Sequence, residues 1–489
     1  MMVNCAVRDA VLAIAVAALI AGCAVGPDYH RPSAEVPPSW QPEAPWHEAA
    51  PRDTALKGNW WELFQDPALN PLVEKALVSN QNLRVADARL QQSRDQLTIA
   101  RSALFPAVEL SGSALRAKDS ANRPLAAYNQ PNQSTVQNDF RLGPSVNYEL
   151  DLFGRVRREV EGARASAEQA EADFENTRLI LMATLASDYF SLREVDAEME
   201  VVRRSLDLQR DALKFVSARH DLGFATGLDL AQQQALLDSS ATQLELLQNQ
   251  RAQFEHAIAT LVGTPAPSFT LTPSASTPPL PAVPLGLPSD LLQRRPDVAS
   301  AERAMAAANA RIGVARAAYF PSIDLAPGFG VPSVGWESNA LASLFTAPSR
   351  LWSIGLSASQ TLFDAGKTRA EVRFADADYT AAVAAYRQTV LTAMEEVENG
   401  ISGLASLERA EIQATASVRS AQRAFDIASE RYKGGVDTYL DVITAEQTLL
   451  TNELQAVQIQ GQQFTTAVFL VKALGGGWNP AVARVSLGN

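Results

Sequence analysis

The stretch from residue 366 to residue 433 constrains the fold more than any other part of the chain. It contains no proline after Gly366, and its apolar residues recur in steps of three and four: Val383, Tyr386, Val390, Met394, Val397, Ile401, Leu404 and Leu407. An average step of about 3.5 residues is typical of coiled coils. A helix of this length would extend roughly 100 Å. It needs long partners, and residues 154–222 form a second proline-free stretch of similar length.

The two stretches belong to an internal repeat. Matching residues lie 212 positions apart: Gly154 and Gly366, Arg219 and Arg431, Gly223 and Gly435, Thr226 and Thr438, and Asp229 and Asp441. Upstream, the Phe-Pro pair at 105–106 recurs at 320–321. We therefore expect two copies of one unit, which consists of a helix, two strands, a very long helix, a turn and a final helix.

Composition divides the chain into six predicted segments. Residues 1–22 carry an apolar run too short to span a bilayer and resemble a secretory signal. Residues 23–65 are rich in proline and are expected to form an extended arm. The others are a first repeat at 66–263, a linker with eight prolines at 264–288, a second repeat at 289–475 and a tail at 476–489. In the first repeat, Asp66-Pro67 predicts the start of a helix that continues to Leu104.

Four segments change to a period of two, which predicts strands. The pattern is clearest at 146–152 and 352–359, and it is shorter at 108–114 and 322–325. One face is aliphatic or aromatic, and the other carries Glu109, Glu149, Asp151 and Asp324. Such strands suit a wall with lipid outside and water inside, where these acids would line the lumen. A half-buried strand of a soluble sheet is the alternative.

Four strands are too few to close a membrane barrel, since such barrels begin at about eight strands. An open sheet edge is not tolerated in lipid. The strands must therefore come from several identical chains. Two chains would supply eight strands, three would supply twelve and four would supply sixteen, and the pattern alone does not choose between these numbers.

The segment Ile20-Ala21-Gly22-Cys23 resembles the cleavage box of bacterial lipoproteins. Cleavage would leave Cys23 as the mature N-terminus, carrying acyl chains, and two or more chains anchor a protein stably. A plain secretory signal with a bystander cysteine is the alternative.

Composition also excludes several functional classes. A net charge of −12 speaks against nucleic acid as a partner. Two cysteines and four scattered histidines give no disulfide framework and no metal-ligand spacing. No phosphate-binding glycine loop and no nucleophile elbow is present. We therefore expect no enzyme, no metal site and no cofactor other than the lipid on Cys23.

Four motifs carry a family resemblance: residues 23–29 (CAVGPDY), Trp60-Trp61 with Phe64 and Asp66-Pro67, residues 291–298 (LLQRRPDV), and Arg431-Tyr432 with Gly435 and Leu440-Asp441-Val442. With them the chain resembles the OprM/NodT-like lipoprotein branch of the TolC-like outer-membrane efflux factors, over essentially all of the mature chain. The resemblance implies a mainly α fold with a small β part. The resemblance also implies that three copies form a twelve-stranded transmembrane β-barrel continued by a long α-helical barrel across the periplasm. It further implies outer-membrane lipid, a periplasmic membrane-fusion adaptor and an inner-membrane RND-type pump as partners.

The resemblance also places the periplasmic entrance at the turns after the long helices. There Asp229, Asp441 and Tyr432 are candidates for the gate, although both acids also fit capping boxes with Thr226 and Thr438. Thr444 stands where the family has a second acid, which speaks against a strong aspartate ring. Asp437 stands where the family has a basic partner for the tyrosine, so the family's latch is not expected here. The candidate docking residues for the adaptor are Gly223, Phe224, Thr226, Gly435, Val436 and Thr438, with ordinary turn chemistry as the alternative.

The expected function is a passive exit duct of a tripartite efflux pump for drugs or other small toxic compounds. One alternative is a duct for polypeptide (type I) secretion, which shares the fold. Another is a coiled-coil scaffold, which leaves the lipoprotein box and the strands unexplained. The family motif at 294–297 is expected to be structural, with Pro296 and Asp297 in the first turn of a helix and the arginines bridging neighbouring segments.

Overall fold

The computed structural model describes residues 24–32, 37, 39–40, 59–120, 135–275, 278–281, 283, 294–335 and 344–476. The predicted signal at 1–22, Cys23 and residues 477–489 lie outside these ranges. The chain divides into two compact units: unit 1 comprises residues 1–32, 91–169 and 302–384, and unit 2 comprises 33–90, 170–301 and 385–489. Each unit takes segments from both predicted repeats.

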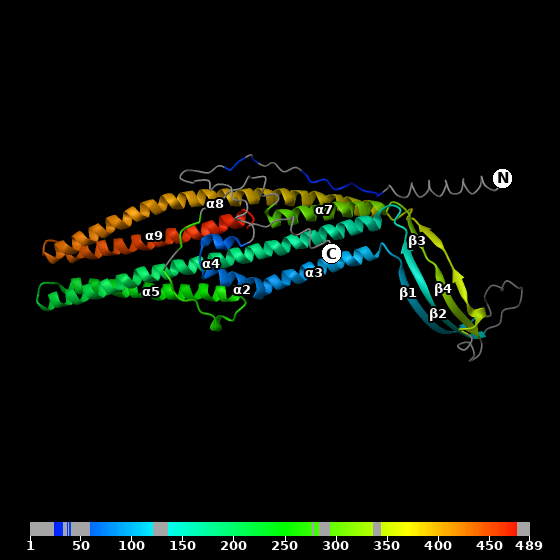
Figure 1. The fold of residues 1–489 in the computed structure, drawn as a ribbon, viewed down its shortest axis with the longest axis horizontal. Coiled ribbons are helices and arrows are strands. Elements are labelled where there is room, and N and C mark those ends of the chain that lie inside the picture. The colour runs from blue at the N-terminus through cyan, green and yellow to red at the C-terminus, as the bar shows by residue number, and fades with distance from the viewer. Residues whose placement is uncertain are drawn as a thin grey trace. The chain divides into compact units, whose positions relative to one another are not determined.

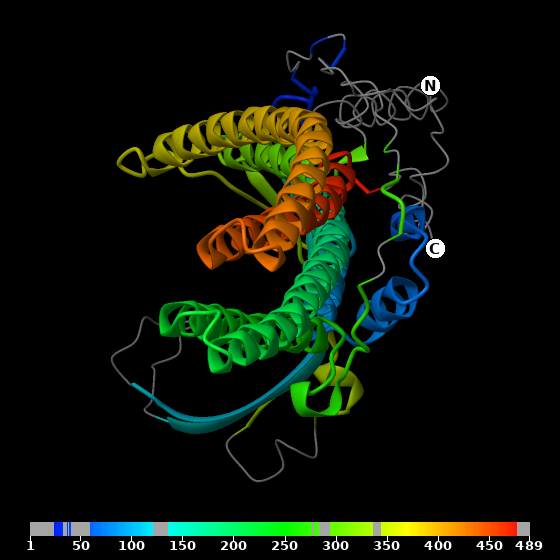
Figure 2. The same ribbon diagram turned by 90° about the vertical axis from the view of Figure 1, so that its left-hand side faces the viewer.

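The helices confirm the predicted repeat and the mainly α fold. The long helices α4 (Arg155–Asp221) and α8 (Lys367–Lys433) each contain 67 residues, and the final helices α5 (Gly227–Leu261) and α9 (Tyr439–Ala473) each contain 35. In unit 2, α5 runs beside α4 and α9 runs beside α8 (Figures 1 and 2). The predicted stripe of α8 is its buried side, with its core at Tyr386, Val390, Val397, Ile401 and Leu404.

A helix precedes the strands in each copy, as predicted, but the first one is interrupted. Instead of one helix from Asp66 to Leu104, the chain forms α2 (Leu69–Ser79) and α3 (Gln81–Ser102). Asn80 between them is extended, and its side-chain oxygen accepts a hydrogen bond from the Leu83 amide at 3.0 Å. Asparagine is a preferred N-cap, so it starts a new helix here. The prediction of one continuous helix was wrong. In the second copy the corresponding helix is α7 (Pro296–Ala317).

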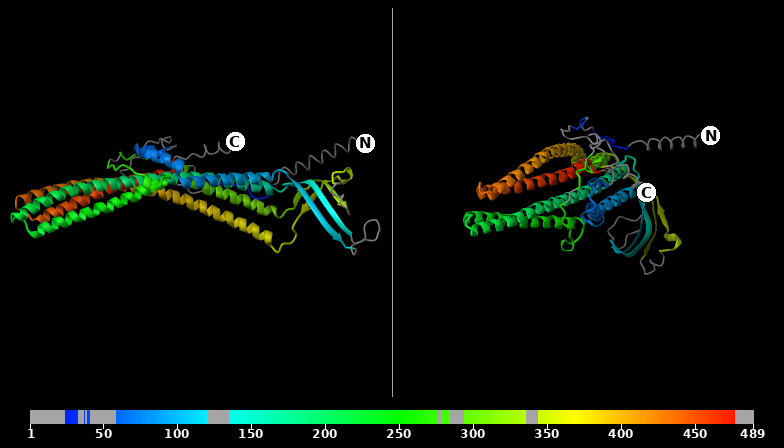
Figure 3. Two further views of the ribbon diagram at one scale, coloured as in Figure 1. Left: turned by 90° about the horizontal axis from the view of Figure 1, so that it is seen from below. Right: turned by 60° about the vertical axis from the view of Figure 1, so that its left-hand side comes forward.

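Unit 1 contains a sheet of six strands, with β1 (Ala107–Asp119) and β2 (Thr135–Glu149) in the first copy. The second copy contributes β3 (Ser322–Leu325), β4 (Gly328–Gly335), β5 (Leu351–Ser353) and β6 (Leu356–Ser359), with the short helix η4 (Ala347–Ser349) before β5. All pairs are antiparallel: β1 pairs with β2, β2 pairs with β3 and β4, β3 pairs with β6, and β4 pairs with β5. Figures 1 and 3 show β1, β2 and β4 side by side in one curved sheet.

The predicted strand segments 108–114 and 322–325 are present, the segment 146–152 is strand only to Glu149, and the segment 352–359 is broken once. Beyond residue 325 the second copy adds β4, which was not predicted, after a further break. The breaks lie at residues 326–327 and 354–355. Pro327 has no amide hydrogen to donate to a sheet. The neighbouring Ala326 amide instead donates to the Gly355 carbonyl at 3.0 Å. The two breaks therefore face each other across the sheet.

The described part of the arm in unit 1, residues 24–32, packs against α4 and α7. The buried guanidinium of Arg158 donates to Asp28 at 2.7 Å, and the Tyr29 hydroxyl donates to Glu302 at 3.0 Å. These two contacts hold residues 28 and 29 against the two helices, and the arm over 23–65 stays a prediction.

The main hydrophobic core lies in unit 2. The 3-10 helix η1 (Trp60–Phe64) buries both tryptophans and Phe64. The Phe64 ring lies 4.9 Å from that of Phe190 on α4, which stacks on Phe464 of α9 at 4.9 Å. The tryptophan motif therefore supplies the centre of this core. No helix within the described ranges is both long and apolar enough to cross a membrane.

The described part of the proline-rich linker is irregular, as predicted, apart from the short helix η2 (Ala266–Ser268). It is fastened to α4 and α5 by two arginines. Arg193 donates to the Thr272 carbonyl at 2.8 Å, and Arg251 donates to the Leu271 carbonyl at 2.6 Å.

Candidate functional site

The adjoining ends of α4, α5, α8 and α9 meet in one apolar cluster, which we call the tip cluster. Its buried members are Val216, Leu236, Tyr432, Tyr439, Val442 and Ile443. The two turns beside it have matching geometry, because Gly223 and Gly435 adopt φ values of +78° and +74°. The amides of Phe224 and Val436 donate back to the carbonyls of Arg219 and Arg431 at 2.8 and 2.9 Å. Each long helix thus ends in a glycine C-cap.

The two predicted capping boxes differ. Thr226 and Asp229 form a complete box: the Thr226 hydroxyl accepts from the Asp229 amide at 3.2 Å, and the carboxylate accepts from the Thr226 amide at 2.8 Å. In the second copy the Thr438 hydroxyl instead donates to the Asp441 carboxylate at 2.7 Å and caps no backbone amide. The first box is confirmed, and the second does not form.

The turns expose apolar side chains at matching positions of the two copies. Phe224 is 72% exposed and its counterpart Val436 is 69% exposed. One turn of helix further on, Leu228 and its counterpart Leu440 are also exposed. Both turns therefore present apolar surface next to the tip cluster.

Tyr432 lies inside the tip cluster. Its ring stands 4.8 Å from that of Tyr439, and the guanidinium of Arg219 covers it at 4.9 Å. Burial raises the pKa of the Tyr432 hydroxyl. Asp437 makes a two-bond ion pair with Arg431, at 2.6 and 2.8 Å. Asp437, which stands where the family has a basic latch residue, is thus paired with an arginine at the same turn.

Below the tip cluster lies a polar cluster that the sequence analysis missed. The Tyr439 hydroxyl donates to Gln233 at 2.6 Å, and the Gln233 amide donates to the Gln209 carbonyl at 3.0 Å. Glu446 is only 5% exposed, and burial raises the pKa of its carboxyl to about 7, with a smaller opposing effect from Gln209. The sequence feature that could have predicted this polar cluster is Glu446 itself, a glutamate on the apolar stripe of α9 between Val442 and Leu449.

The four predicted lumen acids are held differently. The Glu149 carboxylate accepts a hydrogen bond from Arg155 at 2.9 Å, and Glu149 on β2 stands opposite Asp324 on β3 in the strand register. Glu109 on β1 is exposed. Asp151 caps the start of α4, where its carboxylate accepts from the Arg157 amide at 2.8 Å.

The turn from strand to long helix is built alike in both copies. Gly154 and Gly366 have φ values of +83° and +89°, which confirms the predicted sharp bend. Asp364 accepts from the Thr368 amide at 2.8 Å and so caps α8 as Asp151 caps α4. Neither of these two caps was predicted.

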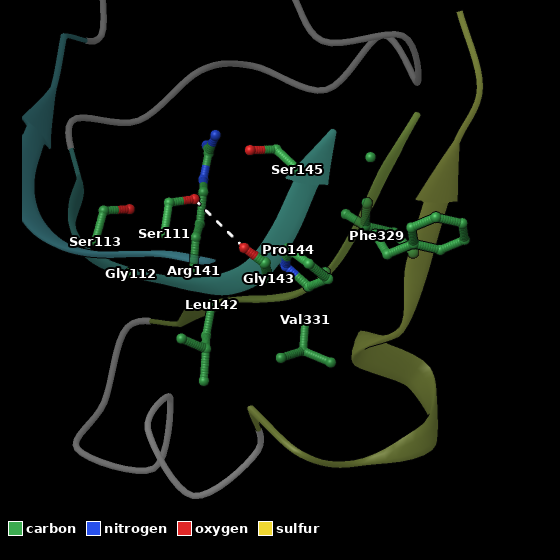
Figure 4. A pocket seen from close by; sticks show the side chains of 13 residues that line it. Ser111, Gly112, Ser113, Arg141, Leu142, Gly143, Pro144, Ser145, Phe329 and Val331 are labelled. Atoms are coloured by element: carbon green, nitrogen blue, oxygen red, sulfur yellow. Dashed lines mark hydrogen bonds between the residues drawn. The ribbon is translucent and has the colours of Figure 1, made fainter. Parts of the chain in front are cut away.

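A shallow pocket of about 310 Å³ lies over the sheet (Figure 4). Arg141 and Ser145 of β2 extend to one side of the strand and Leu142 to the other, while the Ser111 hydroxyl donates to the Gly143 carbonyl at 3.4 Å. Gly143 lies so close to the backbone of Phe329 that any Cβ would collide with it. The pocket therefore reflects glycine at a close approach of two strands. In the described part of the chain, no group of three His, Cys, Asp or Glu side chains is placed to hold a metal ion.

Very long paired helices joined to strands with one apolar face fit a channel that combines a membrane sheet with a helical extension. The chain belongs to the outer membrane efflux protein family, whose model matches residues 72–264 and 287–476. This confirms the predicted resemblance and the predicted function as an outer-membrane efflux channel. Members of this family are transport ducts and not enzymes.

Individual relatives match over nearly the whole chain. The antibiotic efflux pump outer membrane protein ArpC of Pseudomonas putida is 33% identical over 473 residues, which covers 96% of this chain and 95% of the relative. The pyoverdine export outer membrane protein OpmQ of Pseudomonas aeruginosa is 32% identical, covering 86% and 87%. The solved outer-membrane channel OprN is 32% identical with a TM-score of 0.81, covering 93% of this chain and all of that one.

Proposed function

We propose that this outer-membrane efflux channel is a homotrimer that serves as a passive exit duct for drugs or other small toxic compounds. The open sheet carries the proposal. Among the described strands, β1 pairs only with β2, and β5 and β6 each have a single neighbour. An open edge is not tolerated in lipid, so sister chains must continue the sheet. The family resemblance supplies the number three, and with it twelve strand segments and a continuing helical barrel.

The strand faces support a wall between lipid and water. Val108 and Leu110 of β1 and Trp352 of β5 are exposed in the single chain, as is Leu356 of β6. A lipid-facing band would cover them. The acids Glu109, Glu149, Asp151 and Asp324 would then line the lumen.

The exposed apolar turns support docking of a periplasmic membrane-fusion adaptor, which would connect the duct to an inner-membrane RND-type pump. Contiguous apolar surface is characteristic of protein interaction sites. Phe224 and Val436 would supply contact area. Gly223, Thr226, Gly435 and Thr438 would set the shape of the two turns.

The gate would lie beside these turns. Of the two candidate acids, Asp441 is the stronger, because it is exposed and caps no backbone amide; its carboxylate accepts a hydrogen bond from the Thr438 hydroxyl at 2.7 Å. Asp229 is occupied in its capping box. Three copies would bring up to six such carboxylates near one axis, with Tyr432 packed behind them.

A lipid on Cys23 would anchor each chain. The neighbouring residue, Ala24, lies beside Gly154, where the chain passes from β2 to α4. A membrane around the strands would end near this junction, within reach of an acyl chain. Labelling of growing cells with a clickable palmitate analogue is expected to mark the wild-type protein and not Cys23→Ser. A labelled Cys23→Ser protein would contradict this anchor.

The relatives favour small compounds over polypeptides as cargo, since ArpC is named for antibiotics and OpmQ for pyoverdine. Deletion of the gene is expected to raise susceptibility to a panel of small toxic compounds. The wild-type gene should restore resistance, and the double variant Phe224→Asp/Val436→Asp should not. Val78→Asp, which alters an equally exposed residue on α2, is the matched control.

Two results would contradict these proposals. Full resistance of the double variant at normal protein level would remove the docking role of the turns. Loss of a secreted polypeptide with unchanged susceptibility would favour the secretion duct.

A further inference from the structure

Unit 2 contains a cavity of about 550 Å³ between α4, α8 and α9, next to the tip cluster. Its walls are largely aromatic and aliphatic: Leu208, Phe215, Phe425, Tyr432, Tyr439 and Val442. The volume falls within the range of small-molecule sites, which are mostly apolar with a few well-placed polar groups.

Two polar atoms in the lining lack partners. Glu446 is 5% exposed and Tyr432 is 8% exposed. Within the described residues, neither Oε1 of Glu446 nor the Tyr432 hydroxyl has a hydrogen-bond partner. Buried polar atoms without partners are costly, so both atoms favour a ligand that donates hydrogen bonds or carries positive charge.

The charges around the cavity favour a cation. Two of its acids are neutralised, Asp211 by Lys214 at 2.9 Å and Glu430 by Lys433 at 2.9 Å. Asp426 accepts only an amide hydrogen bond, from Gln422 at 2.9 Å. In the described part of the chain, no ion pair balances Asp426, and none balances Glu446 in its ionised form, which predominates above pH 7.

One cation of the protein, Lys433, is among the lining residues and pairs with Glu430 at 2.9 Å. Arg219 lies over the rings of Phe215 and Tyr432, at 5.7 and 4.9 Å, and is not among the residues that line the cavity. Gln209, which faces Glu446 from α4, is neutral.

We propose that this cavity binds a small organic cation, with its ammonium group against Glu446 and its apolar body among the aromatic side chains. Ammonium contacts with a carboxylate and with aromatic rings are both favourable in a partly desolvated site. The inference goes beyond the export function, because binding here requires neither a pump nor transport.

The test is calorimetric titration of the full-length, detergent-solubilised protein with 2-phenylethylammonium, which stays protonated between pH 6 and pH 8. The ligand requires ionised Glu446, whose carboxyl has a pKa of about 7. Affinity is therefore expected to be about tenfold higher at pH 8 than at pH 6. At pH 8, Glu446→Gln is expected to weaken binding at least about tenfold and to remove the pH dependence.

The controls separate charge from shape. The neutral probe 2-phenylethanol should bind more weakly than the cation and should not distinguish Glu446→Gln from the wild type. Glu453→Gln, on the same helix but outside the cavity, should bind the cation like the wild type. Phe215→Ala should weaken binding of both probes, and circular dichroism checks that every variant is folded.

Three results would overturn the proposal. One is equal affinity of the wild type and Glu446→Gln for the ammonium probe. The second is equal affinity of the wild type for both probes. The third combines two measurements: the ammonium probe does not bind, and the pump's other components protect the cysteine of Asp426→Cys from reaction with a maleimide. This result would show that a protein partner occupies the cavity.

Discussion

Arg295 joins three segments of unit 2 just before α7. Its guanidinium, 5% exposed, donates to Asp297 at 2.7 Å, to Glu396 of α8 at 2.7 Å and to the Ala473 carbonyl of α9 at 2.9 Å. For this arginine, the predicted structural role of the family motif is confirmed. The motif itself contains no sign of Glu396 or Ala473, which lie far along the chain.

Replacing Arg295 by alanine should be strongly destabilising, because Glu396 and Asp297 would lose a buried partner. Removing one side of a fully buried ion pair costs about 3–5 kcal/mol. Here the cost should lie at or below the lower end of this range, because both carboxylates are partly exposed and Glu396 keeps Lys472 at 3.3 Å. Arg210→Ala, which breaks an exposed pair with Asp207 on α4, should cost less than about 1 kcal/mol. Thermal unfolding of the purified variants compares the two, and similar melting temperatures would contradict the role of Arg295.

Glu446 should make stability depend on pH. Its carboxyl has a pKa raised from 4.5 to about 7 in the folded state, so the folded protein holds a proton that the unfolded chain releases. Its contribution to stability is therefore greatest below pH 4.5 and is lost as pH rises to 7. The variant Glu446→Gln has no carboxyl to titrate at this position, so it does not lose this stability as the pH rises. Its melting temperature relative to the wild type should rise between pH 5 and pH 8, and a constant difference would contradict the assignment.

Residue roles were only partly predictable from sequence. The repeat gave Asp229 and Asp441 the same capping role, yet only Asp229 performs it, because the Thr438 hydroxyl donates to the second carboxylate instead of accepting from the backbone. Such a choice depends on side-chain rotamers, which spacing does not encode. The cavity beside Glu446 likewise depends on which helices pack together.

Elements were predicted better than residues. Proline-free stretches and the 212-residue offset predicted two long helices, two final helices and the glycine turns between them. The failures are local. Asn80 divides one predicted helix through a side-chain cap, Gly355 lies at a break in the predicted strand 352–359, and the strand β4 that follows Pro327 was not predicted. Periodicity continues across such breaks and therefore does not reveal them.

Two glycines that follow helices allow the cost of a left-handed backbone to be compared with the cost of a steric clash. Gly263 after α5 has φ +66°, and a Cβ there would lie 2.5 Å from the Ser79 carbonyl oxygen. Gly223 has φ +78°, with nothing within 4 Å of such a Cβ. Gly223→Ala should therefore cost only the left-handed strain of about 1–2 kcal/mol. Gly263→Ala should lower the melting temperature further, and an equal effect would show that the contact with Ser79 is unimportant.

At the scale of the whole molecule, the chain is one part of a larger structure. Among the described strands the sheet ends in unpaired edges, and apolar side chains are exposed on these strands and at the turns. The strand pattern and the cost of open edges in lipid predict that identical chains close the sheet into a barrel. They do not predict how many chains, since eight, twelve or sixteen strands would each leave no edge unpaired. The number three comes from the family resemblance.

The most direct test of this account is the mass of the intact assembly, measured by native mass spectrometry after release from an outer-membrane preparation in mild detergent. We expect three copies of the mature chain, each carrying the mass of its attached acyl chains. A folded monomer that is stable in water without detergent would contradict the account.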